Sequence, residues 1–173
     1  MRTINGRAWR YGANIDTDQL APIGSYQGTG DLGDGALNCL RDMDPNFSKS
    51  VVEGDVFVAT DNMGIGSSRE TAPLFLRTLG IRAVVAHSFA RIFYRNCFNI
   101  GLPALVCPEA NEIAMSDDLE IDPLTGEINN KTQGKVYHCQ PIPEHLMSIV
   151  DAGGLMPFLE QKLKKALSLI HIS

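Results

Sequence analysis

The sequence predicts an α/β fold with a parallel sheet at its centre. Three short apolar stretches, VFVAT, IRAVVAHS and LPALVCP, have the length and the apolar continuity of buried strands. Two stretches with helical spacing separate them, SSRETAPLFLRTLG and SFARIFYRNCFNIG. Strands that are connected through helices pair in parallel with right-handed crossovers. The middle of the chain therefore predicts a sheet covered by helices.

The N-terminal part is less regular. INGRAWRYGANIDTDQLAP mixes short alternating stretches with turn residues, which predicts one or two strands and then a polar turn. Asp16 and Asp18 alternate, so an extended backbone would place both carboxylates on one face, where they could hold an arginine or share a proton. The alternative is an Asx-type turn. IGSYQGTGDLGDGA, with five glycines, predicts a mobile loop without a core of its own, and ALNCLRDMD a short helix.

Capping signals bound the two central helices. In the first helix, Gly80 stands where a left-handed C-terminal cap belongs. In the second, Ser88 is the predicted N-cap and Gly101 the stop. The apolar residues of the first helix recur at helical spacing, at Ala72, Phe75, Leu76 and Leu79.

After Pro108 the chain predicts an antiparallel excursion and then a helical end. LEIDP, GEINN and GKVYHCQ are the strand-like stretches of this excursion, for which a hairpin is one possible form. PEHLMSIVDAGGLMPFLEQKLKKAL predicts two helices interrupted by a Gly-Gly break. We interpret residues 1–167 as one domain. Residues 168–173, SLIHIS, have no evident place in the fold and are predicted to be a disordered or non-native tail.

Composition excludes several classes of protein. Of the 173 residues 44% are hydrophobic and 20% charged, the net charge is −5, and no basic tract predicts a nucleic-acid surface. No apolar run approaches a membrane span, and the N-terminus lacks the apolar core of a signal peptide, which favours the cytoplasm. The four cysteines lie far apart without ligand spacing, so we expect reduced thiols and no metal site on this chain.

The run GIGSSRE, residues 64–70, carries the strongest chemical signal. It follows a strand and opens a helix, where backbone N–H groups lack intrahelical partners and favour an anion. Gly64 and Gly66 permit close approach to the backbone, and Arg69 can grip a carboxylate with two hydrogen bonds. The structural alternative is a capping box formed by Ser67 and Glu70. The two interpretations are compatible.

Other motifs are weaker. GTGDLG, residues 28–33, has the spacing of a dinucleotide-binding loop, but the preceding APIGSYQ is a poor strand. The GxSxG elbow of a serine hydrolase is not present. His87, His138 and His145 have no spacing that singles out a base, and KLKK fits a solvated helix face.

Three stretches together resemble a known family. NIDTDQLAP, DNMGIGSSRETAP and AVVAHSFARIFYRNCFNIGLPAL are similar to the small subunits of the aconitase-like isomerases, above all those of 3-isopropylmalate dehydratase (isopropylmalate isomerase). The resemblance covers about residues 5–107. It implies a swivelling β/β/α domain with a mainly parallel central sheet and a smaller antiparallel sheet. It also implies that a separate large subunit holds a [4Fe–4S] cluster, whose fourth iron takes the substrate hydroxyl.

The resemblance implies a role for each residue of the motif. Ser67 resembles the catalytic base that removes the proton next to a substrate carboxylate. Ser68 and Arg69, with Gly66 beside them, resemble the binding site for substrate carboxylates, and Asp18 an active-site carboxylate. The implied reaction is the reversible dehydration of a malate-type hydroxy-dicarboxylic acid by a hydro-lyase that is active only with its large subunit.

The glycine-rich loop departs from relatives that use a basic residue there to choose the substrate. It has no Lys or Arg from Pro22 to Leu40, which argues against citrate and favours 3-isopropylmalate or a methyl- or dimethylmalate. Tyr26 and Gln27 are the loop contacts we expect. Two alternatives remain open: a non-catalytic module that binds an organic acid or phosphate, and a stand-alone hydrolase that uses Ser67.

Overall fold

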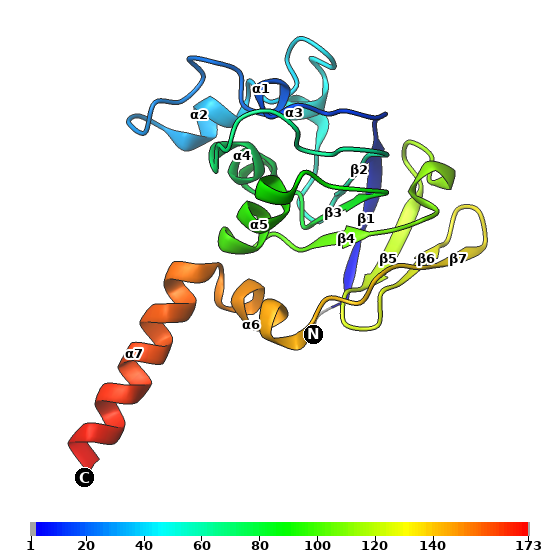
Figure 1. Ribbon diagram of the computed structural model, residues 1–173. Coiled ribbons are helices and arrows are strands. Elements are labelled where there is room, and N and C mark those ends of the chain that lie inside the picture. Colours follow the sequence, from blue (N-terminus) through cyan, green and yellow to red (C-terminus); the bar gives the residue numbers. More distant parts are fainter. Residues whose placement is uncertain (1–2, 173) are drawn as a thin grey trace.

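Seven strands form one curled, mixed sheet in the order β4-β3-β2-β1-β5-β6-β7 (Figure 1). The computed structural model describes residues 3–172. The strands are β1 Ile4–Arg10, β2 Val56–Val58, β3 Ala83–Ala86, β4 Ala104–Val106, β5 Asp118–Asp122, β6 Glu127–Asn130 and β7 Lys135–His138. β1 pairs with β2 on one side and with β5 on the other, so it joins the two halves of the sheet. This agrees with our interpretation of residues 1–167 as a single domain, which stays a proposal.

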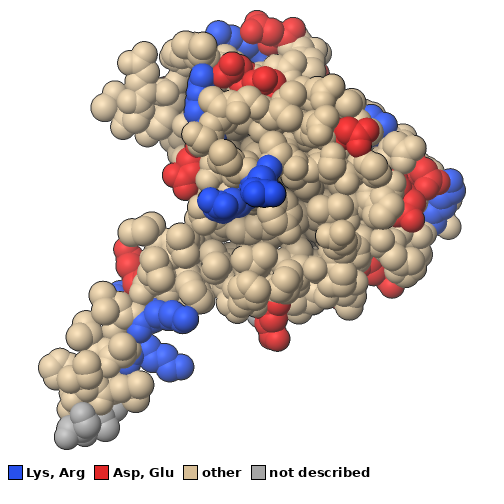
Figure 2. Space-filling view, viewed as in Figure 1, with Lys and Arg blue, Asp and Glu red and all other residues tan. Residues whose placement is uncertain are grey.

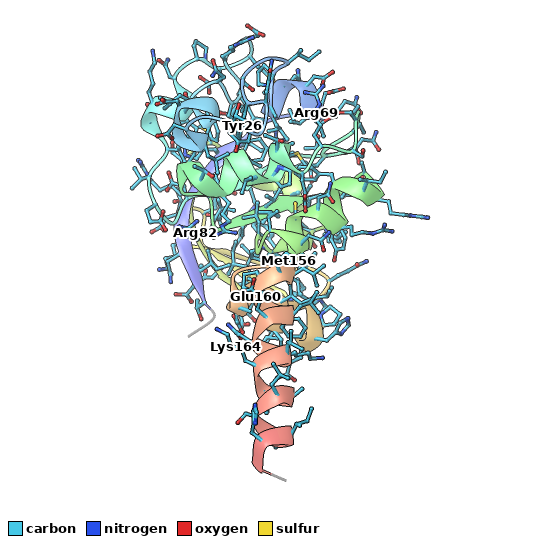
Figure 3. All side chains as sticks on the ribbon, turned by 90° about the vertical axis from the view of Figure 1, so that its left-hand side faces the viewer. Tyr26, Arg69, Arg82, Met156, Glu160 and Lys164 are labelled. Atoms are coloured by element: carbon cyan, nitrogen blue, oxygen red, sulfur yellow. The ribbon has the colours of Figure 1, made fainter. Side chains whose placement is uncertain are left out.

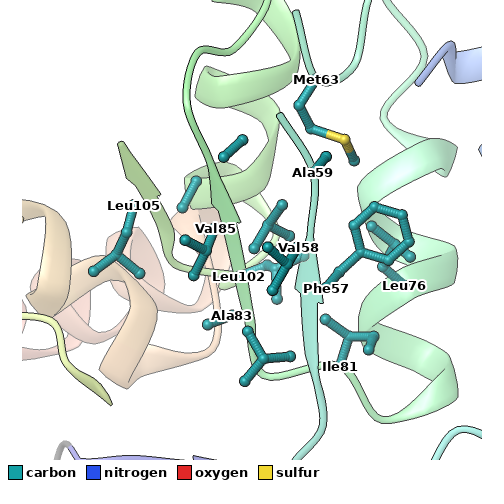
Figure 4. Close-up of a cluster of buried hydrophobic side chains, with 14 of the residues drawn as sticks. Phe57, Val58, Ala59, Met63, Leu76, Ile81, Ala83, Val85, Leu102 and Leu105 are labelled. Carbon is teal, nitrogen blue, oxygen red and sulfur yellow. The ribbon is translucent and has the colours of Figure 1, made fainter. Parts of the chain in front are cut away.

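Strands β1 to β4 are parallel, as the sequence predicts. Every residue of β2 and β3 is buried, which explains why both strands are apolar without alternation. Figure 4 shows Phe57 of β2 directed toward Leu76 and Ile81, while Val85 of β3 lies on the opposite side with Leu102 and Leu105. The core therefore fills both faces of the parallel strands.

The other half of the sheet is an antiparallel meander. β5 pairs with the free side of β1, β6 with β5, and β7 with β6. This confirms the predicted excursion. The buried carboxylate of Asp117 precedes β5 and accepts three hydrogen bonds at Oδ2, from Ala114 N, Asn130 Nδ2 and Gln133 Nε2, at 2.8, 2.8 and 2.7 Å. It ties the meander to the preceding turn.

The helices are grouped around the parallel half. They are α1 Thr17–Leu20, α2 Leu32–Ala36, α3 Phe47–Ser50, α4 Thr71–Leu79, α5 Arg91–Asn99, α6 Glu144–Ala152 and α7 Leu155–Ile172, with a 3-10 turn, η1, at Ala110–Glu112. Figure 1 shows α4 and α5 together beside the parallel strands, α6 beneath them, and α7 projecting away from the body. The layers agree with a swivelling β/β/α domain.

Both central helices begin later than the sequence predicts. α4 starts at Thr71 behind Glu70, and no side chain caps it, so the predicted capping box of Ser67 and Glu70 is absent. α5 starts behind Ala90 rather than at Ser88, whose Oγ accepts a hydrogen bond from Asn62 N at 2.9 Å. Ser67 and Ser88 instead accept hydrogen bonds from neighbouring segments of the chain. The predicted stop at Gly80 is confirmed, with a φ of 117°.

The polar turn near the N-terminus is helical, not extended. Asp16 is the N-cap of α1: its side chain accepts a hydrogen bond from Asp18 N at 2.7 Å, and Gln19 Oε1 accepts one from Asp16 N at 2.8 Å. The Asx-type alternative is therefore correct. In the glycine-rich stretch, Asp31 caps α2, which ends at Ala36, while the helix predicted over residues 36–44 is a series of turns.

The tail is helical as far as Ile172, where disorder was predicted. Apolar residues recur every three or four positions, at Leu159, Leu163, Leu167 and Ile170, and no Gly or Pro follows Pro157. Figure 2 shows this helix standing clear of the body, with basic side chains along one side. The predicted non-native origin of residues 168–173 stays a prediction, and Ser173 lies outside the described residues.

Candidate functional site

Three loops that follow β1, β2 and β3 meet at the carboxyl ends of the parallel strands. Thr17 N donates to Ile65 O, and Gly64 N to Ile15 O, both at 2.8 Å. On the other side, Met63 N donates to Ser88 O at 3.0 Å. Backbone bonds thus hold the GIGSSRE loop between its two neighbours. In open α/β sheets this edge is where ligands bind.

Two glycines of this loop are required by the packing of the protein itself. Gly64 has a φ of 85°, and a Cβ there would lie 2.0 Å from the Phe93 ring. Gly66 has a φ of 108°, and a Cβ there would lie 2.7 Å from Asp16 Oδ1. A side chain at either position is strained and obstructed. The space beside these glycines, which the sequence predicts for a ligand, is filled by Phe93 and Asp16.

Ser67 is exposed at the tip of this arrangement. Its carbonyl oxygen accepts a hydrogen bond from Thr17 Oγ1 at 3.1 Å, and its Oγ lies 3.4 Å from the same hydroxyl. Thr17 is only 1% exposed, so it offers a fixed support from the interior. Ser67 lies four residues before the first residue of α4, which removes it from the first helical turn in which the sequence placed it.

Arg69 and Asp18 form an ion pair beside the serine. Arg69 Nη2 lies 2.7 Å from Asp18 Oδ1, and Arg69 Nη1 donates to Ala21 O at 3.0 Å. Ser68 is exposed, and its carbonyl oxygen accepts a hydrogen bond from Asn96 Nδ2 at 3.2 Å. The structure therefore brings Asp18 together with the consecutive residues Gly66, Ser67, Ser68 and Arg69, from which it is far apart in the sequence.

The comparisons with known proteins show the family. Residues 41–110 match the family described as the aconitase C-terminal domain. The 3-isopropylmalate dehydratase small subunit of Sulfurimonas denitrificans is 46% identical over 161 residues, 93% of this chain and 96% of that protein. The chain belongs to the 3-isopropylmalate dehydratase small-subunit family.

Other members of this family show the same similarity. The small subunit from Caldicellulosiruptor bescii is 46% identical over 94% of this chain and 98% of its own length. The crystal structure of 3-isopropylmalate dehydratase from Methanocaldococcus jannaschii superposes with a TM-score of 0.87 at 41% identity, covering 96% of this chain and 99% of that one. The predicted family, the fold and the assignment to a hydro-lyase subunit are confirmed.

The two predicted loop residues have surroundings different from those of the GIGSSRE run. The Tyr26 ring packs edge-on against Phe75 of α4, with centroids 6.4 Å apart, and Gln27 is exposed. Figure 3 shows Tyr26 and Arg69 at the same end of the molecule. Within the part of the chain that the structure describes, neither loop side chain hydrogen bonds to Ser67 or Arg69.

Sequence reasoning missed the residues that support the motif. Thr17 and Asn96 each hold one serine of the pair from a different element. The only signal for Thr17 is its place between Asp16 and Asp18. His87, for which the sequence offered no partner, lies with Nδ1 2.5 Å from Asp61 Oδ1 in the adjoining loops.

A cavity of about 390 Å³ adjoins the ion pair. Its lining consists of Asp18, Gln19, Leu40, Asp42 and Met43. Asp18 lines the cavity and also forms the ion pair. A ligand in this cavity would therefore contact Asp18, the ion-pair partner of Arg69.

Residues 3–172 offer few ligands for a metal cluster. Over residues 3–172, no three side chains of His, Cys, Asp or Glu come together as a metal site. The four cysteines are free and buried, and of these Cys107 and Cys139 affect each other's pKa. The described residues do not fit a [4Fe–4S] cluster. In addition, none of the described helices is long and apolar enough to span a membrane.

Proposed function

We propose that the chain is the small subunit of a 3-isopropylmalate dehydratase that removes water from a malate-type hydroxy-dicarboxylic acid and returns it at the neighbouring carbon. The observation that carries this proposal is the exposed Ser67 hydroxyl beside the Arg69–Asp18 pair. The names of relatives at about 46% identity support the substrate class. 3-Isopropylmalate, or a methyl- or dimethylmalate, is the substrate we propose.

Ser67 would act as the base in this reaction. A serine hydroxyl is a very weak acid, so its anion must be stabilised while it takes the proton next to a substrate carboxylate. Arg69, two residues further along the chain and paired with Asp18, would supply positive charge. The Thr17 hydroxyl, 3.4 Å from Ser67 Oγ, can turn its proton from the Ser67 carbonyl toward the anionic oxygen. Because α4 begins four residues after Ser67, these side chains, and not the helix terminus, would stabilise the anion.

Ser68 and Arg69 would bind the substrate carboxylates. A guanidinium has five N–H donors, and two of them serve Asp18 and Ala21. The remaining donors can bind a carboxylate, and Ser68, the preceding residue, is exposed. Asp18 restrains the Arg69 side chain before the substrate arrives. Gly66 keeps the backbone before Ser67 in a conformation that L-residues rarely adopt.

The partner would be a large subunit that carries a [4Fe–4S] cluster, and the cluster would supply a Lewis acid for the departing hydroxyl. The cytoplasm is the compartment we propose, because all four cysteines are free thiols. The loop around Tyr26 and Gln27 would face the third substituent of the substrate. It carries no Lys or Arg from Pro22 to Leu40, which suits an uncharged group.

The experiment is an assay of the reconstituted pair. The chain is co-expressed with a cluster-bearing large subunit, and formation of the unsaturated acid is followed by absorbance with 3-isopropylmalate, dimethylmalate, methylmalate and citrate. We expect turnover of 3-isopropylmalate or an alkylmalate only when both chains are present. Turnover of citrate, with no turnover of 3-isopropylmalate or an alkylmalate, would contradict the substrate assignment. Binding of an organic acid without turnover by the pair would favour the binding module, and ester hydrolysis by the lone chain the hydrolase.

A further inference from the structure

Two buried cysteines lie where the two edges of the sheet meet. Cys107 directly follows β4 and Cys139 directly follows β7, the two end strands of the sheet. Gln140 N donates to Val106 O at 3.0 Å, which joins the segments behind these strands. The strand pairings make β7 antiparallel to β4 in direction. In an antiparallel pair, this hydrogen bond places residue 139 directly opposite residue 107.

The backbone geometry leaves the space between the two cysteines to their side chains. Cys107 N donates to Ala86 O at 2.8 Å and Cys139 N to Gly126 O at 2.7 Å, so both N–H groups point away from the partner cysteine. Opposite residues of this non-hydrogen-bonded kind have Cα atoms about 4.5 Å apart and side chains on the same face. Disulfides span Cα separations of about 4.4–6.8 Å.

Each of the two thiols shifts the pKa of the other. A hydrogen bond from the Cys139 thiol lowers the pKa of Cys107, against the opposing effect of burial. The same hydrogen bond, followed by burial, raises the pKa of Cys139. Cys107 Sγ also lies 3.8 Å from Glu109 Oε2, and this side chain opposes the lowering of the Cys107 pKa, whereas a hydrogen bond from the Glu109 backbone favours it. Cys107 is thus the thiol of the pair that ionises first, and the thiolate is the reactive form of cysteine.

We propose that Cys107 and Cys139 form a reversible oxidation site, which a hydroperoxide converts into a disulfide between the two edges of the sheet. The Cys107 thiolate attacks one oxygen of the hydroperoxide: an S–O bond forms, the O–O bond breaks, and the leaving oxygen takes a proton and departs as water or alcohol. The Cys139 sulfur then attacks the sulfenic sulfur, an S–S bond forms, and the hydroxyl leaves as water with the Cys139 proton. Two thiols lose two electrons, and one hydroperoxide is reduced.

Access and location favour this pair over the other two cysteines. Cys107 is as fully buried as Cys39 and Cys97, but its neighbour Cys139 is 6% exposed, so access to the pair is through Cys139. Burial raises the pKa of Cys39 and of Cys97. Val106 and Gln140, the neighbours of the pair, line a cavity of about 360 Å³. That cavity also includes His87 and Ser88 from the loop beside the candidate site. A disulfide would therefore fix one wall of a cavity that adjoins the catalytic edge of the sheet.

The test is a thiol census of the intact chain. The reduced protein is treated with hydrogen peroxide under native conditions, then unfolded and alkylated, and its mass and peptides are measured. We expect two of the four cysteines to escape alkylation, a peptide link between residues 107 and 139, and full recovery of four reactive thiols after treatment with a thiol reductant. Four reactive thiols after peroxide, or a link that includes Cys39 or Cys97, would overturn the proposal.

Single variants separate this site from nonspecific oxidation. In Cys107→Ser and in Cys139→Ser, peroxide should produce no intramolecular disulfide, whereas Cys39→Ala should keep the link between residues 107 and 139. A disulfide that persists in Cys107→Ser would refute the assignment. Peptide mapping of the unaltered chain decides the question even where a variant fails to fold. No step of this test depends on dehydratase activity, so its outcome is independent of the proposed function.

Discussion

The hydroxyl of Thr17 lies between the backbone and the side chain of Ser67. Its Oγ1 donates to the Ser67 carbonyl oxygen at 3.1 Å and is 3.4 Å from Ser67 Oγ. The backbone of Thr17 is itself held by Ile65 O at 2.8 Å. The proposed base therefore rests on a buried residue of α1 as well as on its own loop. Precise support of this kind is what a reacting group needs.

Replacing Thr17 by Val tests this support. Valine has nearly the same shape and lacks the hydroxyl, so the fold should remain and the position of Ser67 should loosen. We expect kcat/KM of the reconstituted enzyme to fall by about tenfold to a hundredfold, with a small change in Tm. Thr78→Val is the matched control, since the Thr78 hydroxyl bonds only within α4. Unchanged kinetics in Thr17→Val would remove this residue from the site.

The ion pair of Asp18 and Arg69 should matter for activity more than for stability. Both side chains are partly exposed, at 53% and 33%, and exposed ion pairs contribute about 0–1 kcal/mol to the free energy of unfolding. In Asp18→Asn, Arg69 loses its restraint, and we expect KM to rise at least about tenfold. Asp42→Asn, which changes the same cavity but not the Arg69 contact, serves as control. Equal effects of the two substitutions on KM would contradict the role of the pair.

Alanine substitutions at two glycines, Gly64 and Gly12, should differ in their effect on the free energy of unfolding. Gly64→Ala would bring a methyl group onto Phe93 in a left-handed backbone conformation, and should destabilise the chain by about 1–3 kcal/mol or more. Gly12→Ala meets nothing within 4 Å and has no positive φ, so its effect should be within about 0.5 kcal/mol. Urea unfolding of both variants measures the difference. Equal stabilities would show that the loop can shift away from Phe93.

Asp117 should make the stability depend on pH in the acid range. Burial alone would raise the pKa of its carboxyl, but hydrogen bonds from Ala114 N, Asn130 and Gln133 outweigh burial and lower the pKa. A carboxyl with a lowered native pKa stabilises the fold above the unfolded value of about 3.9, and this contribution is lost as the pH falls through the native pKa. Asp117→Asn should therefore flatten the fall in stability below about pH 4. The exposed Asp118→Asn is the control; a curve for Asp117→Asn that parallels the unaltered chain would contradict this account.

The parallel half of the fold was predictable from local patterns. β2 and β3 are buried on both faces, so their residues are apolar throughout, and Gly80 marks the end of the helix between them. The starts of α4 and α5 were not predictable in the same way. Ser88 is a good cap by type, but its hydroxyl accepts a hydrogen bond from the backbone of Asn62, 26 residues earlier. Tertiary contacts of this kind leave no local signal.

The candidate site, too, was predictable from the sequence only in part. The GIGSSRE run by itself predicts a carboxylate site, because it places hydroxyl groups next to a guanidinium in the sequence. The partners of that run come from other loops. Thr17, Asn96 and the carbonyl of Ala21 contact it only because the carboxyl ends of the strands are neighbours in space. Likewise, the contact of Gln140 with Val106 depends on how far the sheet curls, which strand patterns do not reveal.

The most direct test of the proposed base is exchange of the substrate proton with solvent. The reconstituted enzyme is incubated with 3-isopropylmalate in deuterated water, and deuterium at the carbon that loses its proton is followed by NMR. In Ser67→Ala, we expect an intact complex of both subunits that binds substrate but incorporates no deuterium. Exchange in Ser67→Ala at the rate of the unaltered enzyme would contradict the assignment of Ser67 as the base.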